Sequence, residues 1–168
     1  DKVCDSVGEE QFEERFTDPG GGYFFSAKEL MMHIADSRWD VLSWINGKHD
    51  GAIEFQLEFG GHEKPWVFRD GVTRDEILKS LADSRAEIEK VLARPETDAL
   101  VVTDALRKSF QDRVAGMQAA GKDTAEVEAK GPSNIANVLM FLAAHEQSHR
   151  GELQWLMRTR GADVFRFV

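Results

Sequence analysis

The sequence predicts an all-α protein folded as an antiparallel four-helix bundle, with an irregular loop or a small hairpin near residues 49–72. Two observations favour this class. Apolar residues recur every three or four positions along several long segments, which is the period of a helix with one buried face. Most of these segments are joined by short connections, as is typical of antiparallel bundles. A chain of 168 residues has the size of one domain with one core, so we expect residues 1–168 to form a single domain.

The composition argues against several classes of function. The formal net charge is −9, and an acidic protein repels nucleic-acid phosphates, so we expect no nucleic-acid partner. The single cysteine, Cys4, allows neither an internal disulfide nor a cysteine-based zinc site, which favours a cytoplasmic location. No apolar run of about eighteen residues is present, so we expect no membrane span. Because the sequence does not begin with Met, a targeting segment ahead of it stays open.

Two helices are predicted in the first third of the chain. Residues 1–18 carry apolar side chains among many acids, and we interpret them as a short helix or the end of a longer one. The Asp-Pro-Gly-Gly-Gly stretch at 18–22 ends this helix. Ser26 and Glu29 then form an S-x-x-E capping box, which marks the start of a long helix ending at Asn46.

The middle of the chain interrupts the helical pattern. Residues 52–59 alternate apolar and polar side chains with the period of a strand, but no clear partner strand follows. We therefore expect an extended loop or a small hairpin within 49–72. Thr73 and Glu76 form a second capping box, and Pro95 is predicted to end the helix that they begin.

Two further helices are predicted in the last part of the chain. One covers about 99–120, and the residues from 121 to 131 form a polar connection. Pro132 lies in the first turn of the final helix, where its missing N–H removes no hydrogen bond. This helix is expected to run to about Arg160.

The apolar seam of the final helix runs through two histidines. Its members follow one another at alternating spacings of three and four residues: Ile135, Val138, Leu142, His145, His149, Glu152 and Leu156. Residues four apart project from one face of a helix, so both histidines should face the bundle interior. His33 lies in the same way on the inward face of the predicted helix 26–46.

Three imidazoles on the inward faces of two helices predict a site for one divalent metal ion. Imidazole suits zinc, nickel, copper or ferrous iron, and zinc is our first expectation, with nickel or iron as alternatives. Three neutral ligands leave a fourth position for water or a substrate, which is the pattern of catalytic rather than structural zinc sites. The alternative is a set of core histidines that are hydrogen-bonded to neighbours, because burying unpaired imidazoles is costly.

The segment from His145 to His149 also reads as H-E-x-x-H, the motif of zincin peptidases with Glu146 as general base. A zincin needs a third ligand further along the chain. Only Glu152 and Asp163 are candidates, and the extended H-x-x-G-x-x-H motif is absent. We therefore favour the bundle site over the peptidase.

Two segments resemble motifs of the DinB superfamily, which includes YfiT-like metal-dependent proteins. Residues 142–153 are similar to its last-helix motif H-x-x-x-H-R-G-Q-L, with Glu152 in place of the common Gln. Residues 26–39 are similar to its S-x-x-E-L-x-x-H-x-x-D element. The chain departs from the family in its short first helix and in a longer region at 97–130.

The resemblance implies a four-helix bundle, commonly dimeric, in which His33, His145 and His149 hold the metal. The candidate catalytic residues are the ionisable side chains near these ligands: Asp36, Glu146, Arg150 and Glu152. Arg150 could steer an anionic thiol or substrate, or it could be a plain surface arginine. For Glu146 a solvated or helix-pairing carboxylate is the alternative.

The resemblance also implies a function. Relatives include thiol-dependent S-transferases, a mycothiol-dependent isomerase and stress-induced proteins. We therefore expect the transfer of a low-molecular-weight thiol to a small electrophile, with a homodimer and a small-molecule partner. A divalent ion held by neutral imidazoles stabilises a thiolate or a hydroxide equally well in principle. A metal-dependent hydrolase and a non-enzymatic metal-binding stress protein therefore stay as alternatives.

Overall fold

The structure of the protein is a computed structural model. It describes residues 7–8, 12–13, 25–47, 53–58, 66–98 and 100–159. The described elements follow in chain order: α3 (Ala27–Asn46), β1 (Gln56–Glu58), β2 (Val67–Phe68), α4 (Arg74–Leu92), α5 (Pro95–Asp98), α6 (Asp104–Ala119), α7 (Ala125–Lys130) and α8 (Ile135–Thr159). The all-α class is confirmed. The small hairpin expected within 49–72 corresponds to β1 and β2, which pair antiparallel.

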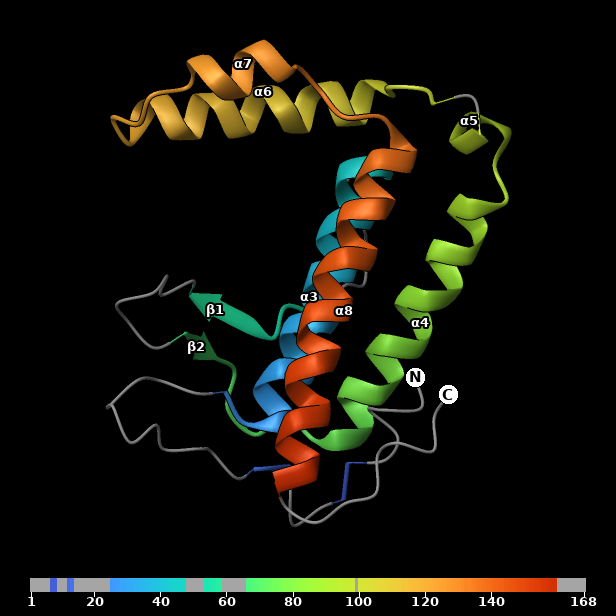
Figure 1. The fold of residues 1–168 in the computed structure, drawn as a ribbon, viewed down its shortest axis with the longest axis vertical. Coiled ribbons are helices and arrows are strands. Elements are labelled where there is room, and N and C mark those ends of the chain that lie inside the picture. The colour runs from blue at the N-terminus through green and yellow to red at the C-terminus, as the bar shows by residue number, and fades with distance from the viewer. Residues whose placement is uncertain are drawn as a thin grey trace.

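Helix α3 lies at the centre of the bundle, with α4 and α8 packed against it (Figure 1). Helices α3 and α8 lie side by side and run in opposite directions, as expected. Helix α4 runs parallel to α3, which differs from a purely antiparallel arrangement. Helix α4 begins at the same end of the bundle as α3, so the two helices point the same way.

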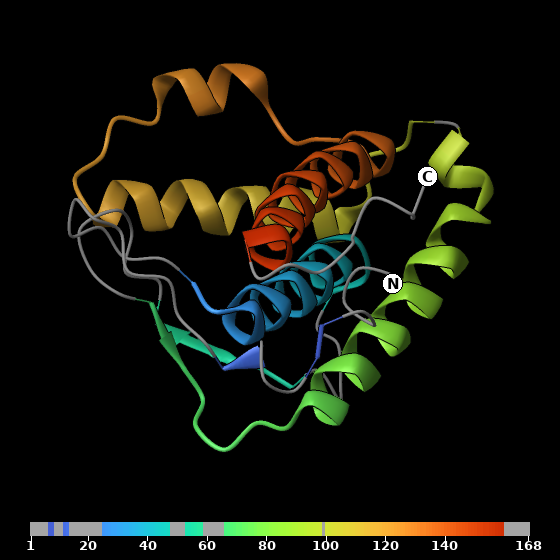
Figure 2. The same cartoon turned by 60° about the horizontal axis from the view of Figure 1, so that its bottom comes forward.

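Helix α6 does not run along the bundle. It crosses the end of α3 and α8 and extends beyond them, and the chain then turns back through α7 toward the start of α8 (Figures 1 and 2). Leu106 is the buried residue of α6, and it joins the core at that end. Among the described residues, no helix is long and apolar enough to cross a membrane.

Both predicted capping boxes are present. The Ser26 hydroxyl accepts a hydrogen bond from the Glu29 N–H at 3.1 Å, and the Ser26 N–H donates to the Glu29 carboxylate at 2.8 Å. Thr73 and Glu76 make the same reciprocal pair at the start of α4. These bonds satisfy backbone amides that have no partner within the helix, so each helix begins where the sequence predicts.

Two local predictions differ from the structure. The polar connection expected at 121–131 contains α7, whose first turn is supported by the Asp123 side chain accepting from the Ala125 N–H at 3.0 Å. Pro95 does not end α4, which stops at Leu92. It begins the short helix α5, where a proline costs no hydrogen bond.

The core divides into two clusters along the bundle. One gathers the beginnings of α3 and α4 with the end of α8, and the other gathers the end of α3 with the beginning of α8. Val7 and Phe12 are buried in the first cluster, so the N-terminal segment contributes to the core. Apart from residues 7–8 and 12–13, the predicted helix 1–18 lies outside the described residues. On α8, His145 and His149 fall between Leu142 of one cluster and Leu153 of the other.

Candidate metal centre

The three predicted ligands meet at one point between α3 and α8. The Nε2 atom of His145 lies 3.2 Å from Nε2 of His33 and 3.1 Å from Nε2 of His149. One ligand atom from each ring lies within 4.8 Å of the others. Nitrogens that share one zinc-like ion at about 2.0–2.1 Å lie roughly 3–3.5 Å apart, so the two measured separations fit a shared ion.

Burial favours the neutral, metal-binding form of His33 and His145. His33 is 7% exposed, and burial lowers its pKa from 6.5 to about 4. Burial also lowers the pKa of His145, and the neighbouring His149 adds to this effect. His145 and His149 are partly exposed, so the site opens toward solvent on the α8 side.

The outer nitrogens of two ligands have hydrogen-bond acceptors. Nδ1 of His33 lies 2.9 Å from Oε1 of Gln56 in β1, and Nδ1 of His149 lies 2.8 Å from Oε2 of Glu152. An acceptor at Nδ1 places the imidazole hydrogen there and leaves Nε2 with a free lone pair. His145 can donate a hydrogen from its own Nε2 to only one of its two neighbours. A divalent ion between the three Nε2 atoms would be bound by all three lone pairs at once, so the residues fit such an ion.

Asp36 does not contact a ligand, but it holds the backbone of Gln56, whose side chain contacts His33. Its carboxylate accepts hydrogen bonds from the Phe55 N–H at 3.0 Å and from the Gln56 N–H at 2.6 Å. Burial raises the pKa of Asp36 from 3.8 to about 7, although the two backbone donors oppose this shift. The structure thus places Asp36 behind the ligand His33, where it holds the β1 backbone that presents Gln56.

Glu152 lies at the solvent side of the site. Its side chain is 51% exposed, and the hydrogen bond from His149 lowers its pKa below the usual value. A carboxylate that accepts from a ligand imidazole fixes the ring orientation and raises its basicity. Of the four candidate catalytic residues, Glu152 is the one that the structure places in direct contact with a ligand.

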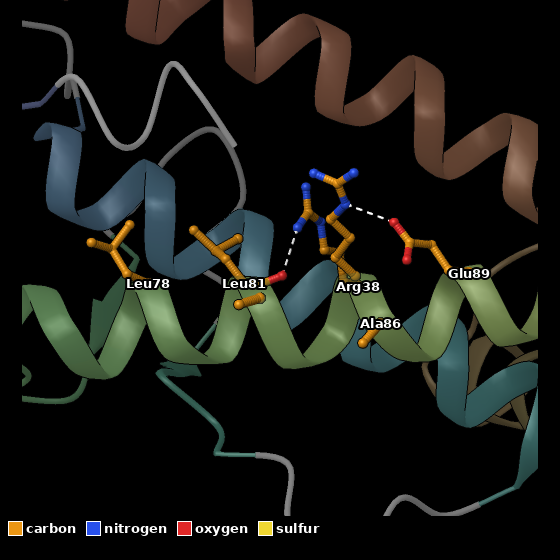
Figure 3. Close-up of a pocket in the computed structure, with 7 residues that line it drawn as sticks. Arg38, Leu78, Leu81, Ala86 and Glu89 are labelled. Carbon is orange, nitrogen blue, oxygen red and sulfur yellow. Dashed lines mark hydrogen bonds and ion pairs between the residues drawn. The ribbon is translucent and has the colours of Figure 1, made fainter.

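Glu146 is held in an ion pair with Arg38 of α3. Its two carboxylate oxygens accept from Nε and Nη2 of Arg38 at 2.6 and 2.8 Å. Arg38 is 5% exposed and also donates from Nη1 to the Leu81 carbonyl at 3.0 Å, as Figure 3 shows. This pair links α3, α4 and α8, which favours the helix-pairing interpretation of Glu146. With His33 in the cluster, the arrangement also differs from that of a zincin.

A cavity of about 210 Å³ lies next to Arg38 (Figure 3). Apart from Arg38 it is lined by α4: Leu78, Leu81, Ala82, Arg85, Ala86 and Glu89. None of the three histidines lines it, so it is separate from the candidate metal centre.

Arg150 does not share the ligand face of α8. Residue 150 is turned by about 100° from residue 149 around the helix axis. Its Nε atom is buried and has no hydrogen-bond partner within the part of the chain that the structure describes. The steering role proposed for Arg150 stays a prediction.

Several residues of the site could not be identified from the sequence. Gln56 and Trp66 reach His33 from the irregular segment, where no helical spacing relates them to it. Arg38 pairs with a residue on a helix that is distant in the chain. Phe141 stacks on His145 with ring centroids 5.9 Å apart. Because residues four apart lie on one face of a helix, the spacing of Phe141 and His145 could have predicted this contact.

One of three comparisons with known proteins gave a match. A family model described as the DinB superfamily matches residues 1–153. Searches of curated proteins and of solved structures gave no match. The family match covers most of the chain, including both histidine-bearing helices, and the chain belongs to the DinB superfamily.

Proposed function

We propose that the protein is a metal-dependent transferase that joins a low-molecular-weight thiol to a small electrophile. The observation that carries the proposal is the convergence of three Nε2 atoms on one point that is partly open to solvent. His33, His145 and His149 would hold one divalent ion, with zinc as the first candidate. When bound, the ion supplies a positive charge that favours a thiolate over a thiol at neutral pH.

The side chains around the site would each have a defined task. Gln56 and Glu152 accept from Nδ1 of His33 and His149, which would leave both Nε2 lone pairs available to a bound ion. The site is closed to water where His33 is buried. The reactants would enter where His145 and His149 are partly exposed. The thiol proton passes to solvent. Sulfur then forms a bond to the electrophilic carbon, and the leaving group departs with its bonding electron pair.

Hydrolysis is the second candidate. The half-exposed carboxylate of Glu152 lies beside a ligand and can accept a proton from water. The ligand set suits water as well as a thiol. A homodimer and a cytoplasmic location stay predictions.

A two-stage experiment tests the proposal. The metal content of protein purified without chelator is measured first. The zinc-loaded protein is then mixed with glutathione, cysteine or coenzyme A and 1-chloro-2,4-dinitrobenzene, and thioether formation is followed by absorbance. We expect faster formation than in buffer, and loss of this acceleration in His145→Ala but not in the exposed α8 control Ser148→Ala. Loaded protein that accelerates none of these reactions would contradict the transferase.

A further inference from the structure

Two aromatic side chains lie against the ligand imidazoles. Phe141 precedes His145 by one helical turn, and their rings stack with an interplanar angle of 19°. Trp66, just before β2, meets the His33 ring edge-on with centroids 4.5 Å apart. We infer that Phe141 and Trp66 form an aromatic subsite for an apolar, ring-bearing part of the thiol or the electrophile. This inference rests on the proposed function.

The Phe141 side chain is placed where a ligand would enter. It is 57% exposed although it touches His145, and His145 belongs to the more open side of the site. An exposed phenyl ring loses the free energy that burial of its apolar surface would release. A ligand ring that covers Phe141 would recover part of that free energy while its thiol group lies at the three Nε2 atoms.

The Trp66 side chain contacts His33, whereas Phe141 contacts His145, and Trp66 is packed against other aromatic rings. Phe25 packs edge-on against it with centroids 4.6 Å apart, and Phe68 lies 6.4 Å from both rings. Trp66 therefore sits in a cluster that connects α3 to β2. Because this cluster touches His33, the subsite includes one exposed ring on α8 and one ring packed among other aromatic side chains beside β2.

The charges around the site divide it into two parts. On the His149 side lies the carboxylate of Glu152, at 2.8 Å from Nδ1. Near His33 and His145 the contacting rings are Trp66 and Phe141. The carboxylate of Glu146, the residue after His145, is paired with Arg38. An apolar ring therefore fits the aromatic side. A negatively charged group of the ligand is disfavoured next to Glu152.

The test compares two thiols that differ only by a phenyl group. Ethanethiol and 2-phenylethanethiol are titrated into the cobalt-substituted protein, and the sulfur-to-cobalt charge-transfer band gives each Kd. We expect 2-phenylethanethiol to bind about tenfold more tightly, because aromatic contacts and apolar burial add to the same thiol group. Phe141→Ala and Phe141→Leu should reduce this preference. The control Met140→Ala, which truncates a 71% exposed apolar side chain of the same helix, should retain it.

The outcomes separate the subsite from the proposed function. If neither thiol gives a charge-transfer band, the proposed function fails and the subsite fails with it. If both thiols bind with equal Kd, or if Phe141→Ala keeps the full preference, the subsite alone is overturned. The ring of Phe141 could instead contact a second copy of the chain. A change of sedimentation in Phe141→Ala together with an unchanged thiol preference would establish that and overturn the subsite.

Discussion

Oε1 of Gln56 lies 2.9 Å from Nδ1 of His33, so a strand residue fixes the ring of a helix residue at the centre of the bundle. The same glutamine is held through its backbone N–H by Asp36, one turn beyond His33 on α3. The chain from Asp36 through Gln56 to His33 explains why the irregular segment matters for the site.

Removal of the Gln56 side chain should weaken metal binding. In Gln56→Ala the His33 ring loses the acceptor that sets its tautomer, and the loss of such an outer partner typically costs about 10–100-fold in metal affinity. Competition with a zinc chelator measures the change. Gln111→Ala removes an exposed glutamine of α6 and should leave the affinity unchanged. Equal affinities of Gln56→Ala and wild type would contradict the role of Gln56.

The Arg38–Glu146 pair should contribute to stability rather than to chemistry. Arg38→Ala leaves the partly buried Glu146 carboxylate without its partner and removes one donor from the Leu81 carbonyl, so we expect a loss of about 2–4 kcal/mol in the free energy of unfolding. Urea denaturation measures it. Arg85→Ala breaks an exposed pair with Glu89 and should cost only about 0–1 kcal/mol.

Glu146→Gln separates the two roles further. The amide keeps one acceptor oxygen for Arg38 but cannot act as a general base. We expect metal content and thiol transfer to stay near the wild-type level. A loss of transfer in a variant that is folded and carries its full metal content would restore Glu146 as a catalytic residue.

The metal-free protein should lose stability as the pH falls from about 6.5 to about 4. The pKa of His33 is about 4 in the folded chain and 6.5 as its ordinary value, so between these values the unfolded chain binds more protons than the folded one. Stability therefore rises with pH in this window and is lost on acidification, by about 2 kcal/mol for His33 at pH 5. Urea titrations of chelator-treated wild type and His33→Gln at pH 7 and pH 5 isolate this contribution. An identical pH dependence in both proteins would contradict it.

Local signals in the sequence predicted a large part of the fold. The capping boxes at Ser26 and Thr73 marked the starts of α3 and α4, because they depend on residues only three positions apart. The apolar seam placed His145 and His149 on the buried side of α8 for the same reason. The parallel course of α4 could not be predicted, since no local spacing encodes the end of the bundle at which α4 begins.

The contacts around the three histidines could not be predicted from the spacing of residues in the sequence. Gln56 lies beyond the end of α3, so the helical period of α3 does not relate it to His33, and Arg38 meets Glu146 across 108 positions of sequence. Such pairs form only when tertiary packing brings two elements together. The family resemblance related His33 to the two histidines of α8, and the structure then brought all three nitrogens within reach of one ion.

The metal content of wild type and of His33→Ala tests the central claim most directly, because His33 is the one ligand contributed by α3. Both proteins are loaded with zinc, freed of excess metal by gel filtration and measured by elemental analysis, after circular dichroism shows that each is folded. The three-histidine site predicts about one zinc per wild-type chain and a small fraction of that in His33→Ala. A folded His33→Ala protein that retains one zinc per chain would contradict the site.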